Sequence, residues 1–185
     1  MTVVQDNNRF SPAVEQVLRA AGWFPGRTLP ESEVEKWYAF RWKEEPAYCY
    51  AHAAALQVLR EFGGLEVKQN APGITCYREP FCIDPLAALG IHDDGWLFFE
   101  WDAPDRLYPL GCADRERDAV LAMTPRGQIF LLGEVLFRCG DTFDQALENL
   151  VLGIMPIEVP IPNLKRDPEE PGRVRAAIRR LYSNE

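Results

Sequence analysis

Apolar positions near the start of the chain recur with the spacing of a helix. One apolar stripe consists of Val14, Val17, Leu18 and Ala21. These residues stand at positions i, i+3, i+4 and i+7, which is typical of a helix that buries one face. Ser11 and Pro12 precede the stripe. Both suit a helix start, because Ser caps the first turn and Pro at the first helical position loses no hydrogen bond. Gly22 ends the predicted helix, and residues 23–26 are predicted to form a packed turn.

Two further helical segments follow. The first is predicted from about residue 32 to residue 43, until Pro46 interrupts the chain. One side of it carries Val34, Trp37, Tyr38 and Arg41. The apolar stripe of the next helix consists of Ala55, Leu56, Leu59 and Phe62. Gly63 and Gly64 end this helix, because Gly tolerates the left-handed backbone that a helix C-terminus favours.

From Leu65 onward the pattern changes to short runs of branched and aromatic residues separated by turn residues. The predicted strands are 65–67, 74–77, 96–101, 107–110, 119–124, 128–132 and 135–139. Residues 124–127, Thr-Pro-Arg-Gly, are predicted to form a tight hairpin turn with Pro at its second position. Strands this close together, with no helix between them, favour an antiparallel sheet.

A closing helix is predicted after the strands. Thr142 and Gln145 have the spacing of a capping box, and Gly153 follows as a stop. The apolar stripe of this helix consists of Phe143, Ala146, Leu147 and Leu150. Beyond it, prolines at 156, 160, 162, 168 and 171 indicate an extended connector before a short basic helix at 173–182.

The order of elements predicts an α+β fold, with N-terminal helices packed on an antiparallel β-sheet and a closing C-terminal helix. We expect one domain at residues 1–154 and an appendage at 155–185. A chain of 185 residues is long enough to bury a core without a disulfide or metal. The five cysteines are odd in number and have no Cys-x-x-Cys spacing, and the N-terminus lacks the features of a signal peptide. We therefore expect a cytoplasmic protein with reduced thiols.

The net charge of −8 constrains the class of partner. Nucleic acids and anionic membranes reward Lys and Arg, so neither is an expected partner, whereas a basic protein is. Residues 84–118 contain nine acids and three arginines, with aromatic residues between them. One interpretation is an acidic, aromatic-anchored binding surface; the other is solvated loops around core aromatics. The candidate partner-binding residues are Asp93, Asp94, Trp96, Glu100, Asp102 and Asp105.

Candidates for catalysis or metal binding are few. His52 near Cys49 suggests a base or ligand, but a packed histidine at a helix start explains it better. Residues 92–94, His-Asp-Asp, offer metal ligands or an ordinary turn. Cys76 and Cys82 flank a turn and are more readily explained as two buried thiols than as a metal or disulfide pair. The sequence contains no phosphate-binding glycine loop or nucleophile elbow, so we predict no enzyme and no cofactor.

Several motifs in a fixed order carry a family resemblance. They are FSP at 10–12, LRAAGWFPGR at 18–27, LREFGGL at 59–65, LGE at 132–134, FDQALENL at 143–150 and Gly153. In these motifs the chain resembles the third family of the SUKH superfamily of bacterial immunity proteins, over about residues 9–154.

The resemblance implies an α+β fold and a function without catalysis. Members of the family are similar to antitoxins that bind and neutralise polymorphic bacterial toxins, often nucleases, which implies a cognate, basic toxin as partner. Related members of the superfamily are general interaction modules, so an endogenous partner is the alternative. The resemblance also implies structural roles. Trp23 would anchor the turn after the first helix, Gly26 would permit its geometry, and Arg27 would pair with a carboxylate or carbonyl. Gly63 and Gly64 would join the third helix to the sheet.

Overall fold

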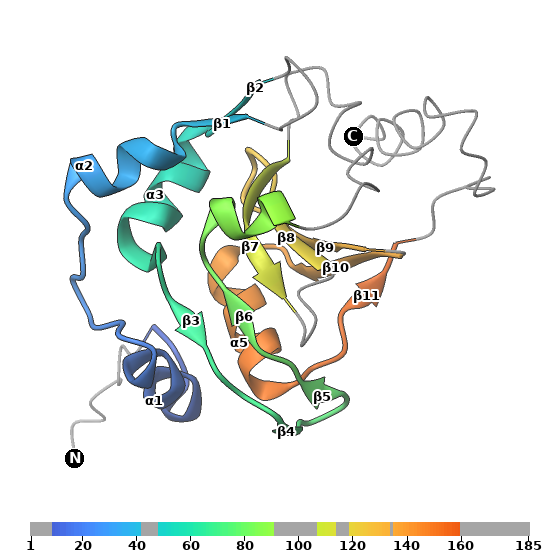
Figure 1. Ribbon diagram of the computed structural model, residues 1–185. Helices are drawn as coiled ribbons and strands as arrows, with labels where there is room; N and C mark the ends of the chain where they lie inside the picture. Colours follow the sequence, from blue (N-terminus) through green and yellow to red (C-terminus); the bar gives the residue numbers. More distant parts are fainter. Residues whose placement is uncertain (1–8, 42–47, 91–106, 114–118, 134, 160–185) are drawn as a thin grey trace, which may run out of the picture.

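The computed structural model describes residues 9–41, 48–90, 107–113, 119–133 and 135–159 (Figure 1). A seven-stranded antiparallel sheet organises these residues, with the strand order β11-β10-β9-β8-β7-β6-β3. Its strands are β3 (Glu66–Val67), β6 (Phe81–Cys82), β7 (Tyr108–Ala113), β8 (Ala119–Met123), β9 (Ile129–Leu132), β10 (Leu136–Gly140) and β11 (Ile157–Glu158). The α+β class predicted from the order of elements is therefore confirmed.

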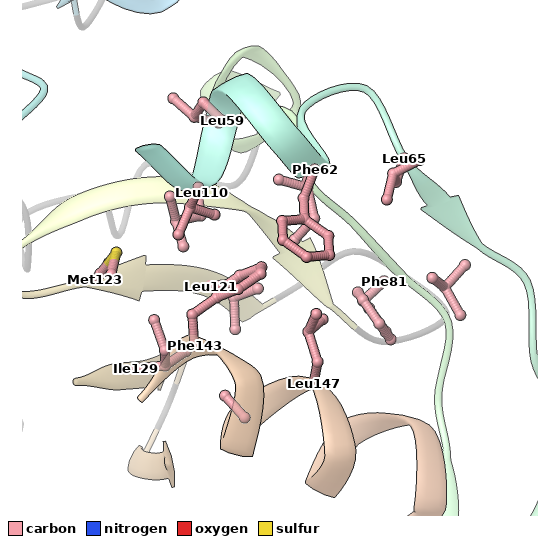
Figure 2. Packing of buried hydrophobic residues seen from close by; sticks show 14 of the residues in the cluster. Leu59, Phe62, Leu65, Phe81, Leu110, Leu121, Met123, Ile129, Phe143 and Leu147 are labelled. Carbon is pink, nitrogen blue, oxygen red and sulfur yellow. The ribbon is translucent and has the colours of Figure 1, made fainter. Parts of the chain in front are cut away.

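The two faces of the sheet pack against different partners. Successive side chains of a strand therefore belong in turn to two different apolar clusters. In β8, Leu121 belongs to the main core, while Val120 and Ala122 belong to a second cluster on the opposite face. The main core is built with the helices α1 (Pro12–Ala20), α3 (Ala53–Phe62) and α5 (Phe143–Leu152). Figure 2 shows Phe62 of α3 and Phe143 of α5 lying close together beside the strands. The second cluster includes Ala88 of the 3₁₀ helix η2 (Pro85–Gly90).

Helix α1 has the predicted bounds, and its end follows from backbone geometry. Gly22 has a φ of +100°, and its N–H donates to the carbonyl of Arg19 over 3.0 Å. The N–H of Trp23 donates to the carbonyl of Leu18 over 2.9 Å. This pair of bonds is the Schellman motif, which satisfies the last carbonyls of a helix. Ser11 stands at the N-cap position but makes no capping bond there.

Helix α5 starts and ends as its sequence predicts. The hydroxyl of Thr142 accepts a hydrogen bond from the N–H of Gln145 over 3.2 Å. The side chain of Gln145 accepts from the N–H of Asp141, one residue before the position that a capping box uses. At the other end Gly153 adopts a φ of +66°, in the left-handed region.

The helix predicted at 32–43 is wrong from residue 38 to residue 41, and its last two residues lie outside the described part of the chain. The structure has a short helix α2 (Glu31–Val34), one 3₁₀ turn η1 (Glu35–Trp37), and then strand β1 (Ala39–Arg41) paired with β2 (Tyr48–Tyr50). The run Trp-Tyr-Ala-Phe-Arg-Trp at 37–42 is rich in aromatic residues, which favour strands. The tighter turn also brings the buried indole of Trp37 to Asp84, to which its Nε1 donates over 2.9 Å.

The strand predicted at 74–77 is also wrong for most of its length. Strands β4 (Ala71–Pro72) and β5 (Tyr77–Arg78) form a separate hairpin, and residues 73–76 are its turn. The N–H groups of Ile74 and Thr75 donate to the carbonyls of Leu152 and Gly153. These carbonyls lie at the end of α5 and have no partner within the helix. The turn therefore supplies the hydrogen-bond donors that the helix end lacks.

The strand predicted at 107–110 extends to Ala113 because a bulge accommodates its proline. The register of β7 against β8 shifts between Pro109 and Gly111, as expected for a proline inside a sheet. Gly111 is required there, because a Cβ would lie 1.9 Å from the carbonyl oxygen of Cys82. The predicted hairpin turn at 124–127 is confirmed: the N–H of Gly127 donates to the carbonyl of Thr124 over 2.9 Å.

Candidate binding cleft

The acidic surface predicted from the sequence lies almost entirely outside the described residues. This applies to the candidates Asp93, Asp94, Trp96, Glu100, Asp102 and Asp105, and to the predicted strand at 96–101. Asp84 is the described member of the acidic stretch, and the fold already uses its carboxylate. It accepts hydrogen bonds from the indole of Trp37 and from the N–H of Leu86, over 2.9 and 3.0 Å.

Trp23 lies in an aromatic cluster rather than on the surface. Its side chain is 4% exposed and stacks on Phe62, with ring centroids 6.0 Å apart and an angle of 5° between the planes. Phe10 packs on the same indole in an edge-to-face arrangement, with the two ring centroids 5.3 Å apart. Its Nε1 donates to Glu61 over 2.9 Å. Trp23 thus ties the end of α1 to α3 by packing and by one polar bond.

Arg27 reaches the C-terminal end of α3. Its guanidinium donates to the carbonyl of Glu61 and to the carbonyl of Gly63, the latter over 2.9 Å. A cation at this position satisfies carbonyls that a helix end leaves unpaired and favours the negative end of the helix dipole. Partial burial lowers the pKa of Arg27. The turn before it depends on Gly26, which has a φ of +81° and open space around it.

The two glycines after α3 serve different purposes. Gly64 has a φ of +77°, a conformation that L side chains avoid. Gly63 has an ordinary φ of −55°, but a Cβ there would lie 2.5 Å from the carbonyl oxygen of Leu59 and 2.5 Å from the ring of Trp37. Gly63 is therefore explained by close packing and Gly64 by backbone conformation.

A solvent-open cleft of about 620 Å³ lies between the turn after α1 and one face of α3. Its lining consists of Arg9, Gly26, Arg27, Thr28, Ala53, Gln57, Arg60 and Glu61. On α3, Gln57 stands at i, Arg60 at i+3 and Glu61 at i+4, so their side chains share a face. Sequence reasoning missed Arg9, Gln57 and Arg60, because only the tertiary fold brings them to the turn that carries Arg27.

Arg9 is the most strongly bound cation of the cleft. Its Nε and Nη2 donate to the carboxylate of Asp144 on α5, over 2.6 and 2.7 Å, and its Nη1 donates to both oxygens of Glu61. The hydrogen bond to Asp144 is the largest cause that raises the pKa of Arg9, and the bond to Glu61 adds to it. The guanidinium also lies 5.2 Å from the ring centroid of Phe62. Arg9 therefore links the start of the described chain to α3 and α5.

Arg60 is held more loosely. Its guanidinium lies 3.2 to 3.4 Å from the oxygens of Glu31, and both side chains of this pair are exposed. It also donates to the hydroxyl of Tyr38 over 3.2 Å. An exposed ion pair of this kind contributes little stability and separates readily.

His52 occupies the N-cap of α3 and uses both ring nitrogens within the fold. Nδ1 accepts a hydrogen bond from the N–H of Ala55 over 3.2 Å, so Nε2 carries the proton and donates to the carbonyl of Met123 over 3.0 Å. Burial lowers the pKa of His52, against the bond to Met123, which raises it. The neutral ring thus joins the helix start to β8, as expected for a packed helix-start histidine. The second catalytic candidate, the His-Asp-Asp run at 92–94, lies outside the described residues.

The two thiols predicted to be buried differ in exposure: Cys82 is buried, and Cys76 is only half-buried. Cys82 lies beside Cys112 of the neighbouring strand, with the two Sγ atoms 2.9 Å apart, and Cys76 is not part of this pair. Burial raises the pKa of Cys139 to about 12, so this thiol stays protonated near neutral pH. In the part of the chain that the structure describes, no cluster of three or more His, Cys, Asp or Glu side chains is placed to hold a metal ion. No helix in that part is long and apolar enough to cross a membrane.

Comparison with known protein families identifies a match over most of the chain. The sequence model of a family described as SUKH-3 immunity protein matches residues 10–153. This range contains every residue of the cleft except Arg9. It also contains the ordered sequence motifs from FSP at 10–12 to Gly153. Searches of curated proteins and of solved structures found no match.

Proposed function

The chain belongs to the SUKH-3 immunity protein family, and from that membership we propose that it binds one cognate toxin stoichiometrically and neutralises it. The observation that carries the proposal is the family match, which spans residues 10–153 and therefore nearly all described elements. We propose that neutralisation takes place in the cytoplasm of the producing cell and needs no catalysis by this chain.

Neutralisation by binding sets a requirement on affinity. A free toxin molecule that is an enzyme acts repeatedly, so protection requires a dissociation constant in the nanomolar range, or about 12 kcal/mol of binding free energy. We propose a basic, nuclease-type toxin domain as the partner, because the chain carries a net charge of −8. Attraction between oppositely charged proteins increases the association rate.

Affinity capture with the tagged full chain in its own host tests the proposal. We expect to capture a large protein whose C-terminal domain kills cells when expressed alone and is harmless when expressed with this chain. Capture of a non-toxic cellular protein instead would favour a general interaction module and would contradict the immunity proposal.

The predicted acidic surface has its own test. Reversing the charges of Asp93, Asp94 and Asp102 together is expected to slow association with the captured toxin and to reduce its dependence on salt. The measurement is the association rate at several salt concentrations. Reversal of Glu33 and Glu35, two exposed acids of the N-terminal region, serves as the control. Unchanged rates and salt slopes would reject the acidic surface while leaving the immunity proposal intact.

The proposed absence of catalysis is tested with the two histidines. A variant with both His52 and His92 replaced by Ala is expected to protect cells in full, provided that it folds. A folded double variant that has lost protection would instead favour an enzymatic mechanism.

A further inference from the structure

The cleft beside α3 contains more positive than negative charge. Three of its lining residues are arginines and one is a glutamate. The carboxylate of Glu61 is already engaged, because it accepts hydrogen bonds from Arg9 and from the indole of Trp23. Arg9 is likewise neutralised, since Asp144 binds it from the other side. The third arginine, Arg60, has an exposed partner in Glu31, which leaves Arg27 as the lining cation with no ion pair among the described residues.

Arg27 is the lining cation that forms no ion pair among the described residues; burial lowers its pKa, and the charge of Glu61 acts in the opposite direction from a longer distance. Among the described residues, no carboxylate oxygen lies within 4.0 Å of its guanidinium nitrogens, and its hydrogen bonds go to two backbone carbonyls. A guanidinium has more N–H donors than these two carbonyls engage. Partial burial of a cation costs solvation energy, and an anion placed against it recovers part of that cost.

The neighbouring side chains fit a carboxylate. Thr28 and Gln57 line the same cleft, are exposed, and have no hydrogen-bond partner among the described residues. Their hydroxyl and amide groups add donors beside Arg27. Arg60 adds a second cation, because its long, exposed pair with Glu31 separates at little cost.

The overall charge of the molecule decides between kinds of anion. A polyanion such as a nucleic acid is repelled by a chain of net charge −8. A single carboxylate on an otherwise basic protein is not repelled, because the rest of that protein is attracted. Planar carboxylates also match the fork of a guanidinium, which binds both oxygens at once.

We propose that this cleft is a carboxylate-binding site that accepts an aspartate or glutamate side chain of the toxin, with Arg27 as its principal donor and Arg60 beside it. The assignment of the carboxylate to a toxin rests on the proposed function. The existence of the site does not, since it follows from the charges and contacts of the cleft.

Two exposed glutamines provide matched variants. Gln57→Glu places a carboxylate inside the cleft, where it would occupy the site, while Gln16→Glu makes the same change on the exposed face of α1. Neither side chain has a partner among the described residues, so both variants are expected to fold normally. Arg27 itself is a poor choice for substitution, because it also binds the end of α3.

The experiment follows the arginine Nε–Hε signals of the full chain by NMR while a probe is added at constant ionic strength. The probes are N-acetyl-aspartate amide, its neutral analogue N-acetyl-asparagine amide, and inorganic phosphate. We expect saturable shifts of Arg27 and Arg60 with the aspartate probe only, with a dissociation constant on the order of 1 mM, as befits so small a ligand. Gln57→Glu should weaken this binding at least about fivefold, and Gln16→Glu should leave it unchanged.

The other outcomes reject the proposal. Absence of saturable shifts, an equal response to the neutral probe, or equal binding by Gln57→Glu would show that the cleft is not a carboxylate site. Tighter binding of phosphate than of the aspartate probe would replace the carboxylate by a phosphate ligand. Because no toxin is used, none of these results bears on the immunity proposal, which the capture experiment tests separately.

Discussion

At the scale of single residues, Trp23 shows how one side chain serves both packing and polarity. Replacing Trp23 by Ala is expected to lower the free energy of unfolding by about 3–5 kcal/mol, since the buried ring would leave a cavity. Trp23→Phe keeps a ring but loses the bond to Glu61, at a cost of about 1 kcal/mol. Urea denaturation of both variants checks the order. A similar, small loss for both would contradict the burial of the indole.

His52 makes the folded chain less stable at acidic pH. Because burial holds its pKa below the usual value of about 6.5, the unfolded chain binds a proton more readily than the folded chain. The contribution of His52 to the free energy of unfolding is therefore fully present above about pH 6.5. It is lost as the pH falls from there toward the pKa of His52 in the folded chain. Protonation at Nδ1 would also break the cap on Ala55.

The test of His52 compares melting temperatures between about pH 7.5 and pH 5.5, on either side of the usual histidine pKa. His52→Asn keeps a capping side chain but cannot titrate in this range. We expect the wild-type chain to lose more of its melting temperature on acidification than His52→Asn does. Equal losses would mean that His52 does not contribute to acid sensitivity.

Single residues were predictable from sequence where their role is local. The packed histidine at a helix start and the glycines at helix ends follow from their neighbours in the chain. Other residues have roles that depend on contacts with residues far away in the sequence. Asp84 was grouped with surface acids, but its carboxylate holds Trp37, which is 47 residues away in sequence.

At the scale of elements, the junction between α3 and η1 depends on Gly63. Gly63→Ala is expected to lower the free energy of unfolding by about 1–3 kcal/mol, because its Cβ would overlap both the carbonyl oxygen of Leu59 and the ring of Trp37. In a Trp37→Leu background the same change should cost less, since the ring is gone. A double-mutant cycle measured by urea denaturation gives the coupling. Zero coupling would locate the cost in the backbone and not in the contact with Trp37.

Elements with a long apolar period were predicted well, and short ones were not. The stripes of α1 and α5 span two turns or more and carry their own end signals. Residues 38–41 and 74–76 lack such a period, and backbone pairing decides their conformation: 38–41 pair with residues 48–51, and 74–76 with the end of α5. The turn at 73–76 takes its partners from the end of α5, which no local pattern could indicate.

At the scale of the whole molecule, the boundary of the domain becomes testable. The domain was predicted to end at 154, and that boundary remains a prediction. In the structure, β11 pairs with β10, and the N–H of Val159 donates to the carbonyl of Leu136 over 2.8 Å. Val159 also packs on the second apolar cluster.

Two truncations separate the sheet from the appendage. A chain that ends at Val159 is expected to melt at the same temperature as the full chain, because it retains β11. A chain that ends at Gly153 should be about 1–3 kcal/mol less stable, since it loses a strand and the burial of Val159. The calorimetric melting curves compare them. A large loss in the chain that ends at Val159 would show that residues after 159 belong to the fold.

The candidate site shows the limit of sequence reasoning at this scale. The motifs indicated the family and the residues Trp23 and Arg27, while the charge pattern pointed to the acidic stretch at 84–118. The cleft remained invisible in the sequence, because it combines Arg9 and the turn at 26–28 with a helix about 30 residues later. Its lining also holds three arginines and one glutamate, whereas the chain as a whole is acidic.

The contact between the first and last helices has a consequence for how soon protection begins. Ser11 is bound to Glu148, and Arg9 to Asp144, so α1 reaches its final position only when α5 is present. At a synthesis rate of about 5–20 residues per second, α5 is completed roughly 7–26 s after α1. During that interval the nascent chain has no complete core. On the proposed function, protection by a newly made chain therefore begins no earlier than the synthesis of α5.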